Sequence, residues 1–85
     1  MKEFTYIIKD NLGIHARPAG MLVKEAEKFK SEITFTTKGK TADAKKIFAL
    51  MSLAAKQGDE IKVTISGEDE ENAQQTIQTF LNNNL

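Results

Sequence analysis

Residues 32–43 read Glu32-Ile33-Thr34-Phe35-Thr36-Thr37-Lys38-Gly39-Lys40-Thr41-Ala42-Asp43. Ile33, Phe35 and Thr37 alternate with polar neighbours, which is the spacing of a strand with one buried face. Gly39 between two lysines indicates a tight turn, after which residues 41–43 can return antiparallel beside the first strand. This segment therefore predicts a β-hairpin, around which the other elements are arranged.

Helical patterns lie on both sides of this hairpin. Before it, from about residue 15 to residue 28, apolar residues recur at the spacing of an amphipathic helix. After it, residues 47–54 predict a second, short helix. We expect that helix to stop near Gly58, because glycine readily adopts the left-handed conformation found at helix ends.

Further outward, alternating apolar residues predict a first strand at residues 4–8 and a fourth at residues 61–66. An acidic stretch at residues 68–71 precedes a third helical pattern that ends near Leu81. The three asparagines at positions 82–84 are expected to fray.

The order of these elements is βαββαβα. It predicts an α+β fold of the open-faced sandwich type, in which a four-stranded, mostly antiparallel sheet carries three helices on one face. The polar strand positions Thr34, Thr36, Lys62 and Thr64 would face water on the uncovered side. With no linker or internal repeat, residues 1–85 are expected to form a single domain.

Composition excludes several classes of function. Twelve basic and twelve acidic side chains give a formal net charge of zero, so no overall field attracts nucleic acid or an anionic membrane. The chain has no cysteine, which excludes thiol chemistry and thiolate metal sites. No export signal or membrane-inserting segment is recognisable, and we expect a cytoplasmic monomer without a metal or cofactor.

The segment with the clearest chemical potential is Gly13-Ile14-His15-Ala16-Arg17-Pro18-Ala19-Gly20. Pro18 suits a first helical turn and disfavours a helical conformation in the residue before it, so the helix should begin within a residue or two of His15. The imidazole of His15 would then overhang the unpaired backbone N–H groups of Ala16 and Arg17, which form an anion site.

Phosphoryl transfer fits this arrangement. The positive end of a helix favours a neutral, nucleophilic imidazole, and the forked guanidinium of Arg17 matches phosphate oxygens. His15 and Arg17 are therefore the predicted catalytic pair, supported by the backbone of Ala16 and Arg17. On physical grounds alone, a structural role for His15 at the surface near the helix start stays open.

The segment Gly13-Ile14-His15-Ala16-Arg17-Pro18-Ala19 resembles the active-site signature of the histidine-containing phosphocarrier family, HPr, of the sugar phosphotransferase system. The resemblance extends along the whole chain. It implies that Nδ1 of His15 accepts a phosphoryl group from phosphorylated enzyme I and donates it to a IIA component of a sugar permease. It also implies that Arg17 attends the phosphate, and that the protein is a relay without multiple-turnover chemistry of its own.

Three positions depart from the family pattern. Lys46 stands where many relatives have a regulatory serine, so phosphorylation by that route is absent, and a lysine is a poorer helix cap than serine. Gly20 stands where alanine or threonine is common, and should loosen the first helix. Ala54 stands where glycine is usual.

Partners are expected to dock on the first two helices. The second helix is more apolar than burial of one stripe requires, and periodicity assigns Ile47, Leu50 and Leu53 mainly to the core. Phe48 and Met51 are then the stronger candidates for an exposed docking patch. The predicted docking residues are Gly20, Met21, Lys24, Lys46, Ile47, Phe48, Met51 and Ser52.

Two alternatives remain on the sequence alone. One is an HPr-like regulatory module that docks reversibly while His15 stays unmodified. The other is a nucleic-acid or small-ligand domain of similar topology, which the zero net charge and the lack of an aromatic and basic strand motif disfavour.

Overall fold

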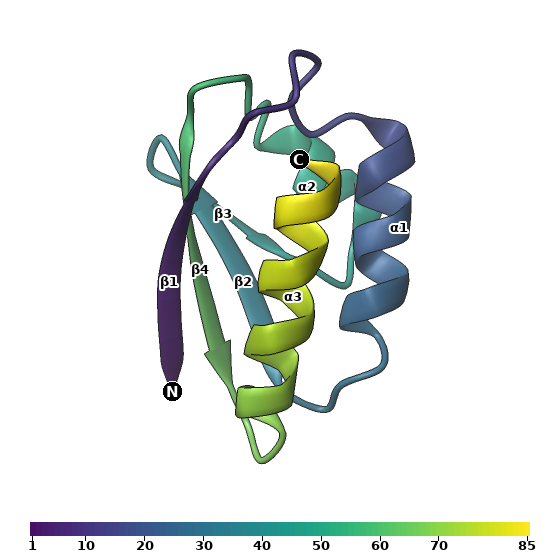
Figure 1. Cartoon of the computed structure of the whole chain (residues 1–85), viewed down its shortest axis with the longest axis vertical. Helices are drawn as coiled ribbons and strands as arrows, with labels where there is room; N and C mark the ends of the chain where they lie inside the picture. Colours follow the sequence, from purple (N-terminus) through teal and green to yellow (C-terminus); the bar gives the residue numbers. More distant parts are fainter.

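The structure is a computed structural model that describes residues 1–85. One of its two layers is a sheet of four strands. The strands are β1 (Lys2–Ile7), β2 (Glu32–Thr37), β3 (Lys40–Asp43) and β4 (Glu60–Ser66), in the spatial order β1-β4-β2-β3. The helices α1 (Ala16–Ala26), α2 (Ile47–Ser52) and α3 (Glu70–Asn84) form the other layer (Figure 1). Every strand pair is antiparallel, and the predicted open-faced sandwich is confirmed.

The predicted hairpin organises the sheet. Phe35 of β2 pairs with Ala42 of β3 on one side and with Val63 of β4 on the other, and all three side chains are buried beneath the helices. Thr34 and Thr64 pair on the opposite face, where they are partly exposed. The alternation of burial along both strands confirms the predicted division into a core face and an open face.

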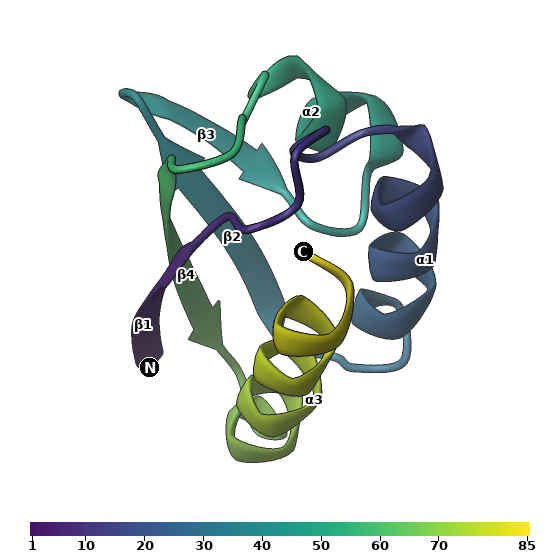
Figure 2. The same cartoon turned by 45° about the horizontal axis from the view of Figure 1, so that its top comes forward.

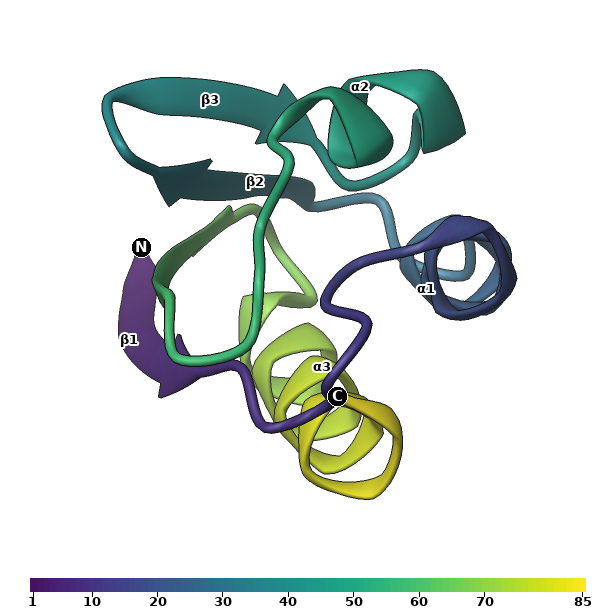
Figure 3. The same ribbon diagram turned by 90° about the horizontal axis from the view of Figure 1, so that it is seen from above.

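The core lies between the sheet and the helices. From the strands, Ile33, Ile61 and Ile65 join it with almost no solvent exposure. The helices contribute Ala19, Leu22 and Ala26 from α1, Leu50 from α2, and Ala73, Ile77, Phe80 and Leu81 from α3. Figure 3 shows α1 and α3 beside each other over the sheet, with α2 next to the end of β3. None of the three helices combines the length and apolar character required to cross a membrane.

The predicted ends of α1 and α3 are wrong, each for a physical reason. The helix α1 ends at Ala26, and the following turn tightens through hydrogen bonds from Lys28 to Glu25 and from Phe29 to Ala26. The asparagines 82–84 do not fray, because α3 continues to Asn84 and the side chain of Leu85 is buried.

The end of α2 also differs from the prediction. The helix stops at Ser52, and the left-handed position directly after its cap is Ala54, with φ of 52°, whereas Gly58 lies in the loop before β4. Alanine in this conformation is strained, because its Cβ approaches the following carbonyl oxygen. Alanine at position 54 therefore has a direct structural cost.

Candidate functional site

The loop between β1 and α1 is held against the loop that follows α2. The buried Ile14 donates its N–H to the carbonyl oxygen of Ala55 at 3.1 Å. Gly13 has φ of 68°, and a Cβ there would overlap that same carbonyl oxygen and the backbone of Lys56. Only glycine allows so close an approach, so Gly13 fixes the position from which His15 projects.

His15 is the N-cap residue of α1. Its backbone is extended, with φ of −109° and ψ of −180°, and its carbonyl oxygen accepts the N–H of Ala19 at 3.0 Å. The side chain makes no capping hydrogen bond. The N–H groups of Ala16 and Arg17 have no acceptor within the chain, so the start of α1 presents unpaired donors together with the positive end of the helix dipole.

The imidazole lies beside a carboxylate. Nε2 of His15 is 4.0 Å from Oδ1 of Asp10, and the two side chains are 35% and 29% exposed. Arg17 is exposed and forms no ion pair within the chain, so its guanidinium is available to an anion. All three side chains border one hollow of about 240 Å³, lined by Asp10, His15, Arg17, Pro18, Met21, Asn83 and Asn84.

The far wall of this hollow is the carboxyl end of α3, which returns beside the loop after β1 (Figure 2). The carbonyl oxygen of Leu85 accepts hydrogen bonds from the N–H groups of Lys9 and Asp10, at 2.6 and 2.8 Å. The hydroxyl of Tyr6 donates to the carbonyl oxygen of Leu81 at 2.9 Å. Burial raises the pKa of Tyr6 above its ordinary value, and its hydroxyl hydrogen bond helps to hold α3 in place.

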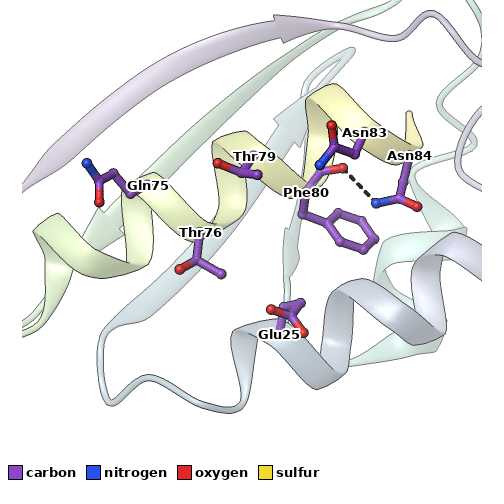
Figure 4. A pocket seen from close by; sticks show the side chains of 7 residues that line it. All are labelled: Glu25, Gln75, Thr76, Thr79, Phe80, Asn83 and Asn84. Atoms are coloured by element: carbon purple, nitrogen blue, oxygen red, sulfur yellow. Dashed lines mark hydrogen bonds between the residues drawn. The ribbon is translucent and has the colours of Figure 1, made fainter.

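A second, larger groove runs between α1 and α3. Its volume is about 500 Å³, and it is lined by Glu25, Gln75, Thr76, Thr79, Phe80, Asn83 and Asn84 (Figure 4). The ring of Phe80 points from α3 toward α1, and the amide nitrogen of Asn84 donates to the carbonyl oxygen of Phe80 at 3.0 Å. Asn83 and Asn84 border both this groove and the hollow at His15.

The predicted docking residues lie on or at the ends of α1 and α2, and Met21 of α1 also lines the hollow at His15. Phe48 is 82% exposed, Met21 42% and Met51 37%, whereas Leu50 and Leu53 are buried. Leu50, Leu53, Phe48 and Met51 are therefore exposed or buried as periodicity predicts, whereas Ile47, which was assigned mainly to the core, is only partly buried against it. The helix α1 packs against α2, and Ile47 is the side chain nearest to Gly20.

The polar members of the predicted docking set are all at the surface. Lys24, Lys46 and Ser52 are exposed. Lys46 is the N-cap residue of α2 and makes no side-chain capping bond, as expected for a lysine at that position. The hydroxyl of Ser52 donates to the carbonyl oxygen of Ala49 at 2.7 Å.

Sequence reasoning missed three residues of the hollow. The run Asp10-Asn11-Leu12-Gly13 predicts only a turn at the end of the first strand, although the position of Asp10 five residues before His15 is a local signal for proximity. Asn83 and Asn84 were assigned to a frayed end, and nothing in their local pattern indicates that they reach His15. Nowhere in the chain do three or more histidine, cysteine, aspartate or glutamate side chains gather in a way that would hold a metal ion.

Sequence comparisons relate the chain to a known family. Residues 2–83 match the family PTS-HPr, described as the PTS HPr component phosphorylation site. The phosphocarrier protein HPr of Xylella fastidiosa strain 9a5c is 43% identical over 83 residues, which cover 98% of this chain and 93% of that protein. HPr of Haemophilus influenzae is 51% identical over 67 residues, which cover 79% of this chain and 78% of that protein.

Solved structures give the same result. The histidine-containing phosphocarrier protein of a mycoplasma superimposes with a TM-score of 0.94 at 40% identity, covering 96% of this chain and 93% of the other. HPr of Thermoanaerobacter tengcongensis gives a TM-score of 0.91 at 40% identity, covering 96% and 92%. The chain therefore belongs to the HPr family of phosphocarrier proteins of the phosphotransferase system.

Proposed function

We propose that this protein accepts a phosphoryl group on His15 from phosphorylated enzyme I and donates it to a IIA component of a sugar permease. The observation that supports this most directly is the imidazole at the start of α1, next to two unpaired backbone N–H groups and the free guanidinium of Arg17. In this proposal the protein acts as a cytoplasmic, monomeric relay that performs no multiple-turnover chemistry alone.

The transfer step follows from this arrangement. The lone pair of Nδ1 attacks phosphorus, a nitrogen–phosphorus bond forms, and the bond from phosphorus to the donor atom of enzyme I breaks with its electron pair returning to that donor. The guanidinium of Arg17 and the N–H groups of Ala16 and Arg17 offset the charge on the phosphoryl oxygens. Delivery to the IIA component reverses these bond changes at Nδ1.

Docking on the surface around the hollow brings the two reacting groups together. The exposed side chains of Met21, Phe48 and Met51 supply apolar contact area that adapts to more than one partner. Lys24 and Lys46 carry positive charge on the same two helices. These features favour sequential binding of two different proteins at one site.

The test is incubation with phosphoenolpyruvate and a general enzyme I, followed by intact mass measurement and phosphorus NMR. We expect one acid-labile, base-stable phosphoryl adduct on wild-type protein and none on His15→Ala, which should stay folded because the imidazole is partly exposed and makes no capping bond. A wild-type mass that never changes would refute the carrier function. Equal partner binding by wild type and His15→Gln would then favour a regulatory docking module.

A further inference from the structure

Asp10 is fixed beside His15 by contacts that do not involve the imidazole. Its N–H donates to the carbonyl oxygen of Leu85 at 2.8 Å, and its own carbonyl oxygen accepts the N–H of Gly13 at 3.0 Å. Its side-chain Oδ1 accepts the N–H of Leu12 at 2.8 Å. Two backbone hydrogen bonds therefore hold the residue, and a third holds its carboxylate, before His15 takes part in any reaction.

The carboxylate faces one particular atom of the ring. Oδ1 lies 4.0 Å from Nε2 of His15, and both side chains are about two-thirds shielded from solvent. An ionised carboxylate only accepts hydrogen bonds. A proton on Nε2 places partial positive charge close to Asp10, whereas the other neutral tautomer places the lone pair of Nε2 close to the negative charge. The first arrangement is attractive and the second repulsive.

We infer that Asp10 is a positioning residue that holds the proton of His15 on Nε2 and so leaves the lone pair of Nδ1 free to attack phosphorus. The inference deepens the proposed function, on which its consequence for transfer rests. Asp10 itself touches neither the phosphoryl group nor the donor. It acts by selecting which ring nitrogen is the nucleophile.

The charge balance during transfer agrees with this role. When the bond between Nδ1 and phosphorus forms and the bond to the donor breaks, Nε2 keeps its proton and the ring becomes a phosphorylated imidazolium. Asp10 then offsets the positive ring from the side of Nε2. The charge on the phosphoryl oxygens is offset separately, by the unpaired donors of Ala16 and Arg17 and the positive end of the α1 dipole.

The experiment compares wild type, Asp10→Asn and Asp43→Asn. Asparagine at position 10 keeps an oxygen that can accept the N–H of Leu12 but removes the negative charge. Asp43 is the matched control, because its Oδ1 accepts the N–H of Lys45, also two residues ahead and at 2.8 Å, and no histidine lies beside it. Proton–nitrogen correlation NMR of the neutral imidazole reports the ratio of the two tautomers in unphosphorylated protein.

We expect Asp10→Asn to lower the ratio of the Nε2–H to the Nδ1–H tautomer by at least about threefold, and Asp43→Asn to leave it unchanged. We also expect Asp10→Asn to accept phosphoryl several-fold more slowly at saturating enzyme I. An unchanged ratio in Asp10→Asn, or an equal shift in Asp43→Asn, would overturn the role of Asp10.

The tautomer measurement needs no donor, so it separates the two proposals. A protein that shows the expected tautomer shift but never acquires the phosphoryl adduct would refute the carrier function and leave the positioning role intact. Normal phosphorylation on Nδ1, with the same tautomer ratio in wild type and Asp10→Asn, would refute the positioning role and leave the carrier function intact.

Discussion

Replacing Gly20 with alanine adds one methyl group to the interior of α1 and should stabilise the protein. Alanine is favoured over glycine inside a helix by about 0.8 to 1.0 kcal/mol. A Cβ at this position would lie 3.6 Å from Cδ1 of Ile47, which is ordinary van der Waals contact. The methyl group therefore meets no steric penalty, and its partial burial contributes a further ~0.4 kcal/mol, half the value of a fully buried methylene.

The expected gain in the free energy of unfolding is thus about 1 to 1.5 kcal/mol. For a domain of this size it corresponds to a rise in Tm of roughly 4 to 12 °C. Thermal unfolding followed by circular dichroism measures the shift, and urea titration should give a higher midpoint with an unchanged slope.

Two other glycines supply controls with the same chemical change. Gly39 has φ of 78° and open space around it, so Gly39→Ala should lose about 1 kcal/mol through backbone strain alone. Gly13→Ala should be far more damaging, because its Cβ collides with the backbone at Ala55. A Gly20→Ala protein no more stable than wild type, or one that loses stability as Gly39→Ala does, would refute the reasoning.

Three further predictions concern the cap of α2, the loop after α1 and the docking patch. Ala54→Gly should stabilise the protein by about 0.5 to 1 kcal/mol in chemical denaturation, because relief of about 1 to 2 kcal/mol of left-handed strain exceeds the extra entropy of the unfolded glycine. The carboxylate of Asp69 accepts the hydroxyl and N–H of Ser31 and the N–H of Lys30, and these bonds lower its pKa. The stabilisation by this ionised carboxylate is complete above the pKa of an unfolded aspartate, about 3.9, and is lost as pH falls through the lower pKa of the folded state. Asp69→Asn should therefore have a lower free energy of unfolding than wild type at neutral pH. The difference between the two proteins should shrink only below about pH 4. Phe48→Ala should slow phosphoryl acceptance at low enzyme I about tenfold or more, while Tm stays nearly constant, because the ring is 82% exposed.

Each of these has a result that contradicts it. Loss of stability in Ala54→Gly would mean that the left-handed alanine is not strained. A gap between Asp69→Asn and wild type that stays constant from neutral to acid pH would show that the carboxylate acts without its charge. A Phe48→Ala protein that unfolds at a much lower temperature would assign that ring to the core.

Local patterns in the sequence are sufficient for most of the fold and for the start of the site. Alternation around Ile33 and Phe35 predicts the central strand, because every second side chain of a strand faces the core. Pro18 locates the start of α1 to within a residue or two, because its ring is compatible only with a first helical turn, and this in turn places His15 over unpaired N–H groups. These conclusions need only neighbours a few positions apart.

Tertiary structure alone decides the rest of the site, because the residues that build it are far apart in the chain. Tyr6 and Leu81 are 75 positions apart, yet their hydrogen bond helps to bring the end of α3 to the hollow. Asparagine has low helix propensity, so local pattern assigns residues 82–84 to a frayed end. Burial of Leu85 and its two hydrogen bonds to the loop after β1 override that propensity and set Asn84 beside His15.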